Sequence, residues 1–361
     1  MADEVRNTFW QESRTAIKAT KSDAPLIGEV WGDGSEYLVG NEMDSLMNYR
    51  FKFAVTDFIA KSTSSASTFN SQLVAIQEDY PAPAWYAMMN LVDSHDTARF
   101  LNDAGGDKSK LKLAALLQMT YPGAPTIYYG DEVGVTGGSD PDSRRTYPWG
   151  NEDNTLRNVY KQLIALRKTY PALRTGNVNH GLLIDDANGG YAFGRDDASN
   201  NIVVALNNNA SARTMTINVF GYIANGAVLT DVLNGNATYT VSNGSVSVPV
   251  SARWGAVLVL SSVQVTFTEV GYVTSYGQNI FIVGNVPELG NWNTAQAVPL
   301  SWVNSNTWSG PVAFTTSEGQ TIQYKYIVKN SDGAIIGEGG NNHTYTVPTS
   351  GTASKTDNWQ P

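Results

Sequence analysis

The first 175 residues alternate between segments typical of helices and segments typical of buried strands, and this alternation is the strongest constraint on the fold. The segments with apolar residues at helical spacing are residues 8–20, 52–60, 69–77, 111–121 and 156–170. The short apolar segments predicted as strands are residues 25–31, 44–51, 87–96 and 124–132. This order favours a parallel sheet covered by helices, in which the carboxyl ends of the strands meet at one rim.

Four strand–helix units are half of the eight that close a TIM (β/α)8 barrel. The α/β part is therefore either a different fold or the C-terminal half of such a barrel. From residue 176 the sequence changes to short alternating runs rich in Val, Thr, Asn and Gly, and a second block of this kind begins near Val263. The sequence thus predicts a multidomain chain, with an α/β domain at residues 1–175 followed by two all-β sandwich domains at residues 176–262 and 263–361.

The charge balance disfavours several classes of partner. Lys and Arg number 24 and Asp and Glu 33, a net charge of −9 without a basic run, so we expect neither nucleic acid nor an anionic membrane as partner. No segment approaches the roughly 20 apolar residues of a membrane span. The chain has no Cys, and its three His residues are not at ligand spacing, so we predict no metal site. A neutral substrate rich in hydroxyl groups fits better.

Three polar clusters follow predicted strands and should meet at the rim of the sheet. They are Glu29-Val30-Trp31, Asp93-Ser94-His95-Asp96 and Gly130-Asp131-Glu132. Each cluster taken singly is more commonly a turn or a helix cap, and the functional interpretation depends on all three lying together. Carboxylates gathered around a neutral sugar ring are what glycoside hydrolysis requires, whereas metal-assisted hydrolysis lacks the His ligands.

Three segments in this order carry a resemblance to a known family. "APLIGEVW", "NLVDSHDTARF" and "GAPTIYYGDEVG" resemble successive conserved regions of the α-amylase family, glycoside hydrolase family 13, in its neopullulanase and maltogenic-amylase branch, over residues 1 to about 262. The resemblance implies that Glu29 is the general acid/base and that Asp96 stabilises the transition state. It implies that His95 and Trp31 bind substrate.

Two further segments of the same resemblance imply sugar-binding residues and one departure. "SDPDSRRTYPW" resembles a sugar-binding loop and implies roles for Asp140 and Arg144, and "MADEV" implies a substrate-site role for Glu4. In that branch the nucleophilic Asp directly precedes the segment that resembles "MADEV". We therefore expect the nucleophile, the first four barrel strands and the usual Ca2+ ligands upstream of Met1. On this expectation the chain needs no cofactor of its own, is inactive or nearly so alone, and has an upstream half-barrel as a partner.

The last block offers aromatic side chains beside amides and a Lys, a combination that suits glucose rings because aromatic faces stack on them. Over its whole length it resembles a starch-binding domain, carbohydrate-binding module family 20. The resemblance implies one glucan site with Trp292, Lys325 and Asn342, and a second with Tyr276 and Trp302. Trp308 is predicted to fill the core. Because Gly337 stands where the family has a stacking Trp, we expect the second site to carry more of the binding than usual.

The predicted function is retaining hydrolysis of α-1,4-glucosidic bonds in starch and related α-glucans, by an extracellular enzyme whose signal peptide is absent from this chain. One alternative is a non-catalytic starch-binding fragment. Another is an amylopullulanase or neopullulanase. A cyclodextrin glucanotransferase is less favoured, because "LVLSSVQVTFTEV" leaves no room for the additional domain that such enzymes insert before their terminal module.

Overall fold

The computed structural model describes residues 2–197, 200–261, 263–314, 317–348 and 351–361. Met1, to which the resemblance assigns the start of the motif, and residue 262, the predicted end of the middle domain, lie outside the described residues. The chain divides into two compact units, which we describe separately. The first comprises residues 1–195, 204–213 and 249–255, and the second residues 196–203, 214–248 and 256–361.

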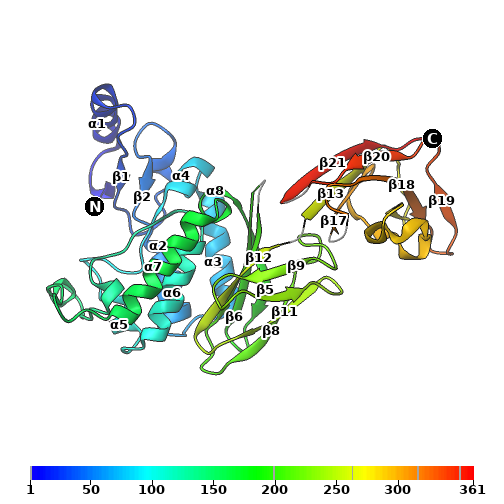
Figure 1. The fold of residues 1–361 in the computed structure, drawn as a ribbon. Coiled ribbons are helices and arrows are strands. Elements are labelled where there is room, and N and C mark those ends of the chain that lie inside the picture. Colours follow the sequence, from blue (N-terminus) through cyan, green and yellow to red (C-terminus); the bar gives the residue numbers. More distant parts are fainter. Residues whose placement is uncertain (1, 198–199, 262, 315–316, 349–350) are drawn as a thin grey trace. The chain divides into compact units, whose positions relative to one another are not determined.

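The first unit contains most of the helices (Figure 1). Its helices are α1 (Asn7–Thr20), α2 (Tyr49–Val55), α3 (Ala66–Asp79), α4 (Ala82–Ala87), α5 (Phe100–Asp103), α6 (Lys108–Thr120), α7 (Asn154–Thr169) and α8 (Ala172–Thr175). Its short 3-10 segments are η1 (Ala2–Glu4), η2 (Ser35–Leu38), η4 (Asp131–Val133) and η5 (Asp142–Arg144), and α2 continues into the π-helical segment η3 (Thr56–Ala60). Its first four strands are β1 (Ile27–Gly28), β2 (Ser45–Leu46), β3 (Met89–Asn90) and β4 (Ala124–Pro125).

These four strands are parallel and follow one another in space in the order of the sequence. β1 pairs with β2, β3 pairs with β4, and a parallel bridge between Met47 and Met89 joins the two pairs. α-Helices lie between β2 and β3 and between β3 and β4, whereas the 3-10 segment η2 lies between β1 and β2. After β4, α7 packs against α6 (Figure 1). Consecutive parallel strands joined through helices are the arrangement of a (β/α)8 barrel. The structure confirms the predicted α/β half-barrel.

The predicted core faces of α6 and α7 are buried, whereas that of α1 is not. Leu113, Leu116 and Leu117 of α6 are completely inaccessible to solvent, as the helical spacing predicts. On α1, however, Phe9 is 53% exposed and Ile17 is 40% exposed. The apolar stripe of α1 therefore has no cover among the described residues.

The strand predicted at residues 44–51 is wrong in its second half. β2 ends at Leu46 and α2 begins at Tyr49, because the side chain of Asn48 accepts a hydrogen bond from the backbone N–H of Phe51, at 3.1 Å, and caps the helix. The apolar run continues through the turn, so hydrophobic pattern alone does not show the boundary. As a result Tyr49 lies at the rim of the sheet instead of within a strand.

The middle part of the chain is all-β, as predicted. Its strands are β5 (Asn177–Asp185), β6 (Gly190–Asp196), β7 (Asn201–Asn207), β8 (Arg213–Asn218), β9 (Val228–Asp231), β10 (Ala237–Thr240), β11 (Ser245–Val250) and β12 (Trp254–Leu260). Six of them form a sheet in the order β10-β9-β12-β7-β6-β5, and β11 pairs with β8. β6 and β7 are buried along most of their length, which explains their continuous apolar character.

The C-terminal module, residues 263–361, is a two-sheet sandwich within the second unit (Figure 1). Its strands are β13 (Val263–Val270), β14 (Asn279–Gly284), β15 (Val298–Pro299), β16 (Ser301–Asn304), β17 (Thr307–Phe314), β18 (Thr321–Lys329), β19 (Ile335–Gly337), β20 (His343–Thr346) and β21 (Thr352–Asn358), and its 3-10 segments are η6 (Pro287–Trp292) and η7 (Thr294–Gln296). One sheet has the order β16-β17-β13-β21, and the other has the order β15-β14-β18-β19 with β20 beside β18. The core between them includes Trp308, as predicted. In the described part of the chain, no helix combines the length and apolar character that crossing a bilayer requires.

Candidate active site

Glu29 follows β1 directly, and its carboxyl group is held by two aromatic residues. The indole Nε1 of Trp31 donates to Oε1 of Glu29 at 3.2 Å, and the hydroxyl of Tyr49 donates to the same oxygen at 3.1 Å. The rings of Trp31 and Tyr49 stack at 4.5 Å with an angle of 19°. Because both donors engage Oε1, a proton added to the carboxylate would reside on Oε2.

Tyr49 was not predicted as a site residue, yet it connects Glu29 to the next polar cluster. Its hydroxyl lies 3.0 Å from the hydroxyl of Ser94, which in turn accepts the backbone N–H of Asp96 at 3.2 Å. Burial raises the pKa of Tyr49 to about 12, so its hydroxyl stays protonated as a donor at neutral pH. The segment "MNY" at the end of the second strand was the available signal, because it places a polar aromatic residue at the rim.

Asp96 lies at the centre of a group of charged side chains at the same rim. Its Oδ2 is 3.2 Å from Nε2 of His95, and its Oδ1 accepts from a guanidinium nitrogen of Arg144 at 3.2 Å. Arg144 also pairs with Asp140, at 2.6 Å. The side chains of Asp96 and Arg144 are roughly a third and a half exposed, so these pairs order the rim more than they stabilise the fold. The structure thus brings four predicted site residues together.

Glu4 lies on η1, and its side chain is exposed. The backbone N–H of Ala2 donates to the carbonyl of Glu29 at 2.8 Å, which joins η1 to the end of β1. Glu4 therefore belongs to a short segment that this backbone hydrogen bond attaches to the end of β1.

Two of the other acids in the predicted clusters are not available to a ligand. Asp93 and Asp131 are both almost completely buried, and Asp131 accepts a hydrogen bond from the guanidinium of Arg99 at 3.2 Å. Glu132 accepts the backbone N–H of Gly130 at 2.8 Å and so closes the turn after β4. Glu29 and Asp96 are the acids of the clusters that the hydrogen bonds through Tyr49 and Ser94 connect. Among the described residues, no group of three or more His, Asp or Glu side chains converges as metal ligands would, and no step below involves a metal.

In the C-terminal module, Trp292 is held in an exposed position by its backbone. It ends η6 with φ of 62°, and Asn291 before it has φ of 49°, a left-handed conformation that non-glycine residues rarely adopt. The indole is 41% exposed. Strained backbone that presents an aromatic ring to solvent is typical of binding loops.

Lys325 and Asn342 lie on or beside β18, on the sheet that carries η6. Lys325 donates to the backbone carbonyls of Glu338, Gly339 and Gly340, so all three of its N–H groups are engaged. The structure therefore shows Lys325 fixing the loop next to Asn342, rather than presenting a free ammonium group to a ligand. Asn342 is exposed and donates to the side chain of Gln323 at 3.1 Å.

Tyr276 and Trp302 are both strongly exposed and lie around the buried Trp308. Tyr276 is 109% exposed and Trp302 is 62% exposed. Trp308 lies opposite Trp302 across the β16–β17 pair, and its indole Nε1 donates to Thr274, two residues before Tyr276, at 3.3 Å. Trp308 thus contacts the segments that carry both exposed rings, and a shared second site for Tyr276 and Trp302 stays a prediction.

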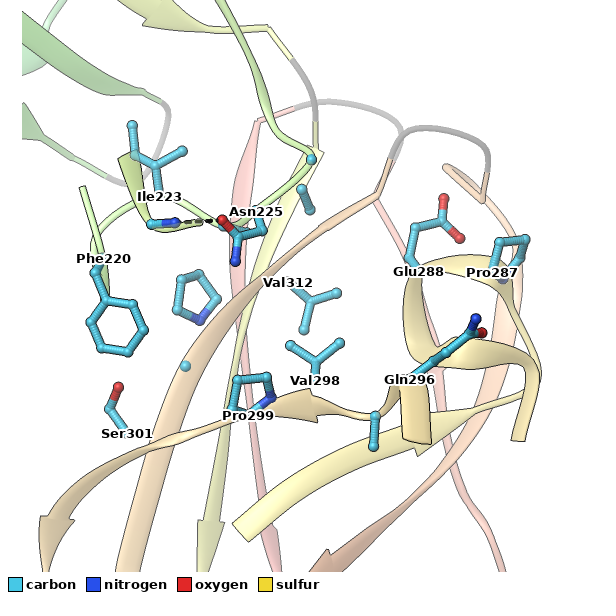
Figure 2. A pocket seen from close by; sticks show the side chains of 18 residues that line it. Phe220, Ile223, Asn225, Pro287, Glu288, Gln296, Val298, Pro299, Ser301 and Val312 are labelled. Carbon is cyan, nitrogen blue, oxygen red and sulfur yellow. Dashed lines mark hydrogen bonds between the residues drawn. The ribbon is translucent and has the colours of Figure 1, made fainter. Parts of the chain in front are cut away.

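A pocket of about 460 Å³ in the second unit contains none of the predicted site residues (Figure 2). Apolar side chains, among them Phe220, Ile223 and Val312, line much of it, and Glu288 and Gln296 add polar groups. Among the described residues, Phe220 is the only aromatic side chain that lines it, and none of the predicted starch-binding residues does so.

Comparison with known proteins agrees with this division of the chain. Residues 3–155 match the family described as alpha amylase, catalytic domain, and residues 262–357 match the family described as starch binding domain. An amylopullulanase from Thermoanaerobacterium thermosulfurigenes is 37% identical in an alignment 290 positions long, which covers 71% of this chain and 16% of that protein. Neopullulanase 2 from Thermoactinomyces vulgaris is 41% identical over 221 residues, 61% of this chain and 38% of that protein.

A solved structure shows the same similarity in three dimensions. A cyclomaltodextrinase superposes with a TM-score of 0.67 at 38% identity, over 72% of this chain and 44% of that one. The chain thus spans between 16% and 44% of the length of these three proteins.

Proposed function

Since residues 3–155 belong to the α-amylase catalytic-domain family and residues 262–357 to the starch-binding domain family, we propose that the chain supplies half of the active site of a retaining α-glucan hydrolase that cleaves α-1,4-glucosidic bonds in starch. The observation that carries the proposal is the chain of hydrogen bonds from Glu29 through Tyr49 and Ser94 to Asp96. It ties the two accessible acids to one rim.

In the proposed reaction Glu29 is the general acid and then the general base. As the glycosidic C–O bond breaks, the proton of the Glu29 carboxyl passes to the leaving oxygen, and a second carboxylate bonds to the anomeric carbon. Water then hydrolyses that bond while Glu29 takes up a proton from it. Asp96, held by His95 and Arg144, places negative charge beside the sugar ring, which stabilises the positive charge that develops in the transition state.

The proposal assigns the nucleophilic Asp to a barrel strand outside this chain, so that the 361 residues alone are inactive or nearly so. Two observations support it. The described half-barrel has four parallel strands where a closed barrel has eight. The elements that come first in the half-barrel, α1 and β1, also expose apolar side chains, namely Phe9, Ile17 and Ile27. This exposure is expected of apolar residues that another half-barrel would cover.

The module at residues 263–361 supports a second function that does not depend on the barrel. The exposed rings of Trp292, Tyr276 and Trp302 are suited to stacking on glucose, so the chain can bind starch even when it does not cleave it. A polymer as substrate also supports an extracellular location. The relatives named amylopullulanase and neopullulanase favour activity of the complete enzyme on pullulan as well as starch.

Two assays on the purified chain test both functions. Reducing-sugar release from soluble starch is compared between the wild type and Glu29→Gln, alone and after addition of a separately produced upstream half-barrel. Pull-down on insoluble starch is compared with a Trp292→Ala/Tyr276→Ala variant. We expect retained binding, no hydrolysis alone, and Glu29-dependent hydrolysis after complementation. Hydrolysis by the chain alone that requires Glu29 would show that the nucleophile lies within these residues.

A further inference from the structure

The loops that carry the predicted ligand-binding residues are joined beneath the rim by one buried Arg. Arg99 is completely inaccessible to solvent, and the Cζ atom of its planar guanidinium lies 3.7 Å from the centre of the Tyr128 ring. Its Nε donates to the carbonyl of Ser143 at 2.7 Å, and one terminal nitrogen donates to the carbonyl of Tyr129 at 2.7 Å. Ser143 in turn donates through its hydroxyl to the carbonyl of His95, at 3.0 Å.

Arg99 thus connects the loop after β3, the turn after β4 and the loop at residues 137–145. The first of these carries His95 and Asp96, and the third carries Asp140 and Arg144. The backbone N–H of Arg99 also donates to the carbonyl of Gly137 at 3.0 Å. A change at Arg99 or its partners would therefore alter the rim without touching a ligand.

Two buried acids, Asp93 and Asp131, lie with Arg99, and together we call the three residues the buried Asp–Arg cluster. Oδ2 of Asp93 accepts the backbone N–H of Phe100 at 2.6 Å, and Oδ1 of Asp131 accepts from Arg99 at 3.2 Å. The other oxygen of each acid has no hydrogen-bond donor among the described residues. The two carboxyl groups are within hydrogen-bonding reach of each other.

Two ionised carboxylates in contact inside the protein would repel each other without water to screen them. Burial raises the pKa of both acids, and that of Asp131 is raised further by the charge of Asp93. Two cations oppose this effect, because Arg99 lowers the pKa of both acids and Lys52 lowers that of Asp93. Tyr160, completely buried nearby, adds no charge, because burial raises its own pKa well above the usual value.

We propose that Asp93 and Asp131 share one proton at neutral pH. The shared proton gives each orphaned oxygen a partner, and the single negative charge that remains is balanced by Arg99. The neutral cluster then positions the loops of the rim. Asp93, Asp131 and Arg99 are positioning residues in this account, since none of them reaches the accessible site.

Infrared spectroscopy of the full chain in D2O detects the proton directly, because a protonated carboxyl has a carbonyl stretch distinct from that of a carboxylate. We expect a protonated-acid band at neutral pH that disappears in both Asp93→Asn and Asp131→Asn. Glu269 is a third buried acid whose pKa is raised, to about 7, so all spectra are taken in a Glu269→Gln background. A spectrum unchanged by both Asn substitutions would overturn the proposal.

Hydrogen exchange of the loops at residues 94–99 and 137–145 tests the positioning. Asn at position 131 can accept from Arg99 and donate to Asp93, so we expect wild-type exchange in Asp131→Asn. Asp131→Ala loses both functions, and Asp93→Asn/Asp131→Asn leaves Arg99 without a counter-charge. We expect exchange about tenfold faster in these two variants, the effect of one lost buried hydrogen bond.

Far-ultraviolet circular dichroism and chemical unfolding of each variant show whether the first unit, which contains Asp93 and Asp131, is still folded. Equal acceleration of exchange in Asp131→Asn and Asp131→Ala would contradict the shared proton, because it would mean that a neutral donor cannot replace the acid. None of these measurements requires hydrolysis, so they remain decisive if the proposed activity proves wrong.

Discussion

At the scale of single residues, Gly337 stands where the resemblance to the starch-binding family implies a Trp. A single substitution can restore that Trp and so test its role directly. It lies exposed on β19, opposite Ile327 of β18, with φ outside the left-handed region. A Cβ atom added at this position would meet no atom within 4 Å. A Cβ atom therefore fits without moving the sheet, and the exposed position leaves the rest of a side chain free to extend into solvent. The resemblance to the starch-binding family implies a Trp at this position, and we therefore expect a ring placed here to stack on glucose.

We expect Gly337→Trp to strengthen binding to soluble starch or maltooligosaccharides by about fivefold or more, since each stacked ring contributes roughly 1–3 kcal/mol in comparable systems. Isothermal titration calorimetry measures the change. Ile336→Trp is the matched control, because Ile336 is adjacent on the same exposed strand but has the opposite orientation. A gain of equal size in the control, or a gain that persists when Trp292 is changed to Ala, would show that the new ring does not complete the first site.

Glu269 predicts a pH dependence for the C-terminal module. It is completely buried, one oxygen accepts the backbone N–H of Tyr272 at 3.1 Å, and the other has no hydrogen-bond partner among the described residues. Burial, with a contribution from the charge of Glu338, raises its pKa from 4.5 to about 7. The folded state therefore holds a proton that the unfolded state releases between these values, so the stabilisation is lost as pH rises from about 4.5 to about 7.

We expect Glu269→Gln to remove this loss and to be more stable than the wild type by roughly 1–3 kcal/mol above pH 7, since one pKa unit corresponds to about 1.4 kcal/mol. Urea unfolding of the full chain, followed by loss of starch binding at about pH 5 and about pH 8, measures the difference. Glu318→Gln in the same module should keep the wild-type pH dependence. A variant that weakens with pH as much as the wild type would assign the effect to another group.

The residues of the candidate site could be found from the sequence to the extent that they follow predicted strands. Glu29 and Asp96 do so, and both reach the rim. Tyr49 was missed because the helix cap at Asn48, which places it there, depends on a side-chain contact within an apolar run. The burial of Asp93 and Asp131 could not be predicted, because it results from contacts of Arg99 with loops that are distant in the chain.

At the scale of elements, the C-terminal end of α6 is capped by two Arg side chains instead of by a glycine turn. Arg167 donates to the carbonyls of Met119 and Tyr121, and Arg195 donates to the carbonyl of Thr120. These are carbonyls that a helix end leaves without partners, and they carry the negative end of the helix dipole. Both guanidinium groups also bind the carbonyl of Leu173, which joins α6 to α8.

We expect Arg167→Met to destabilise the first unit by about 3 kcal/mol or more, because several buried carbonyls lose their donor at once. Chemical unfolding monitored by circular dichroism measures the loss. Arg174→Met is the control: Arg174 also donates to helix carbonyls, those of Arg167 and Lys168, but its side chain is exposed, and we expect a change below about 1 kcal/mol. Similar effects in the two variants would show that burial of the acceptors does not determine the cost.

Sequence periodicity identified the elements better than it identified their ends or their partners. α6 and α7 were predicted within a few residues because their apolar faces are buried over several turns. The strands of the half-barrel have only two residues each, whereas the apolar runs that contain them extend further along the chain. The exposed stripe of α1 shows the limit of the method, since periodicity indicates that a face is apolar but not that something covers it.

At the scale of the whole molecule, charge and binding chemistry are separate. The chain carries a net charge of −9, but its predicted starch-binding residues are mostly aromatic or amide, and the one Lys among them is engaged by carbonyls. Stacking on a neutral sugar does not depend on long-range charge. Starch binding should therefore be insensitive to salt.

We expect the affinity for soluble starch to change by less than about twofold between low salt and roughly 1 M NaCl, where charge interactions are screened within about 3 Å. Binding of an anionic dextran sulfate, measured in the same way, provides the comparison for any charge-dependent contact. A steep loss of starch affinity with salt would indicate that Lys325 or another cation contacts the ligand directly.

The pairing of β13 with β21 also sets an order in which the parts of the chain can fold during synthesis. β13 is the first strand of the C-terminal module, and its parallel neighbour β21 is the last strand among the described residues, with Thr352 opposite Gln264. The half-barrel strands, by contrast, each pair with the next strand along the chain. Contacts between residues distant in sequence form slowly and only after both have left the ribosome. The strands around Glu29 can thus pair before β21, which the starch-binding module needs to complete its sheet, has been synthesised.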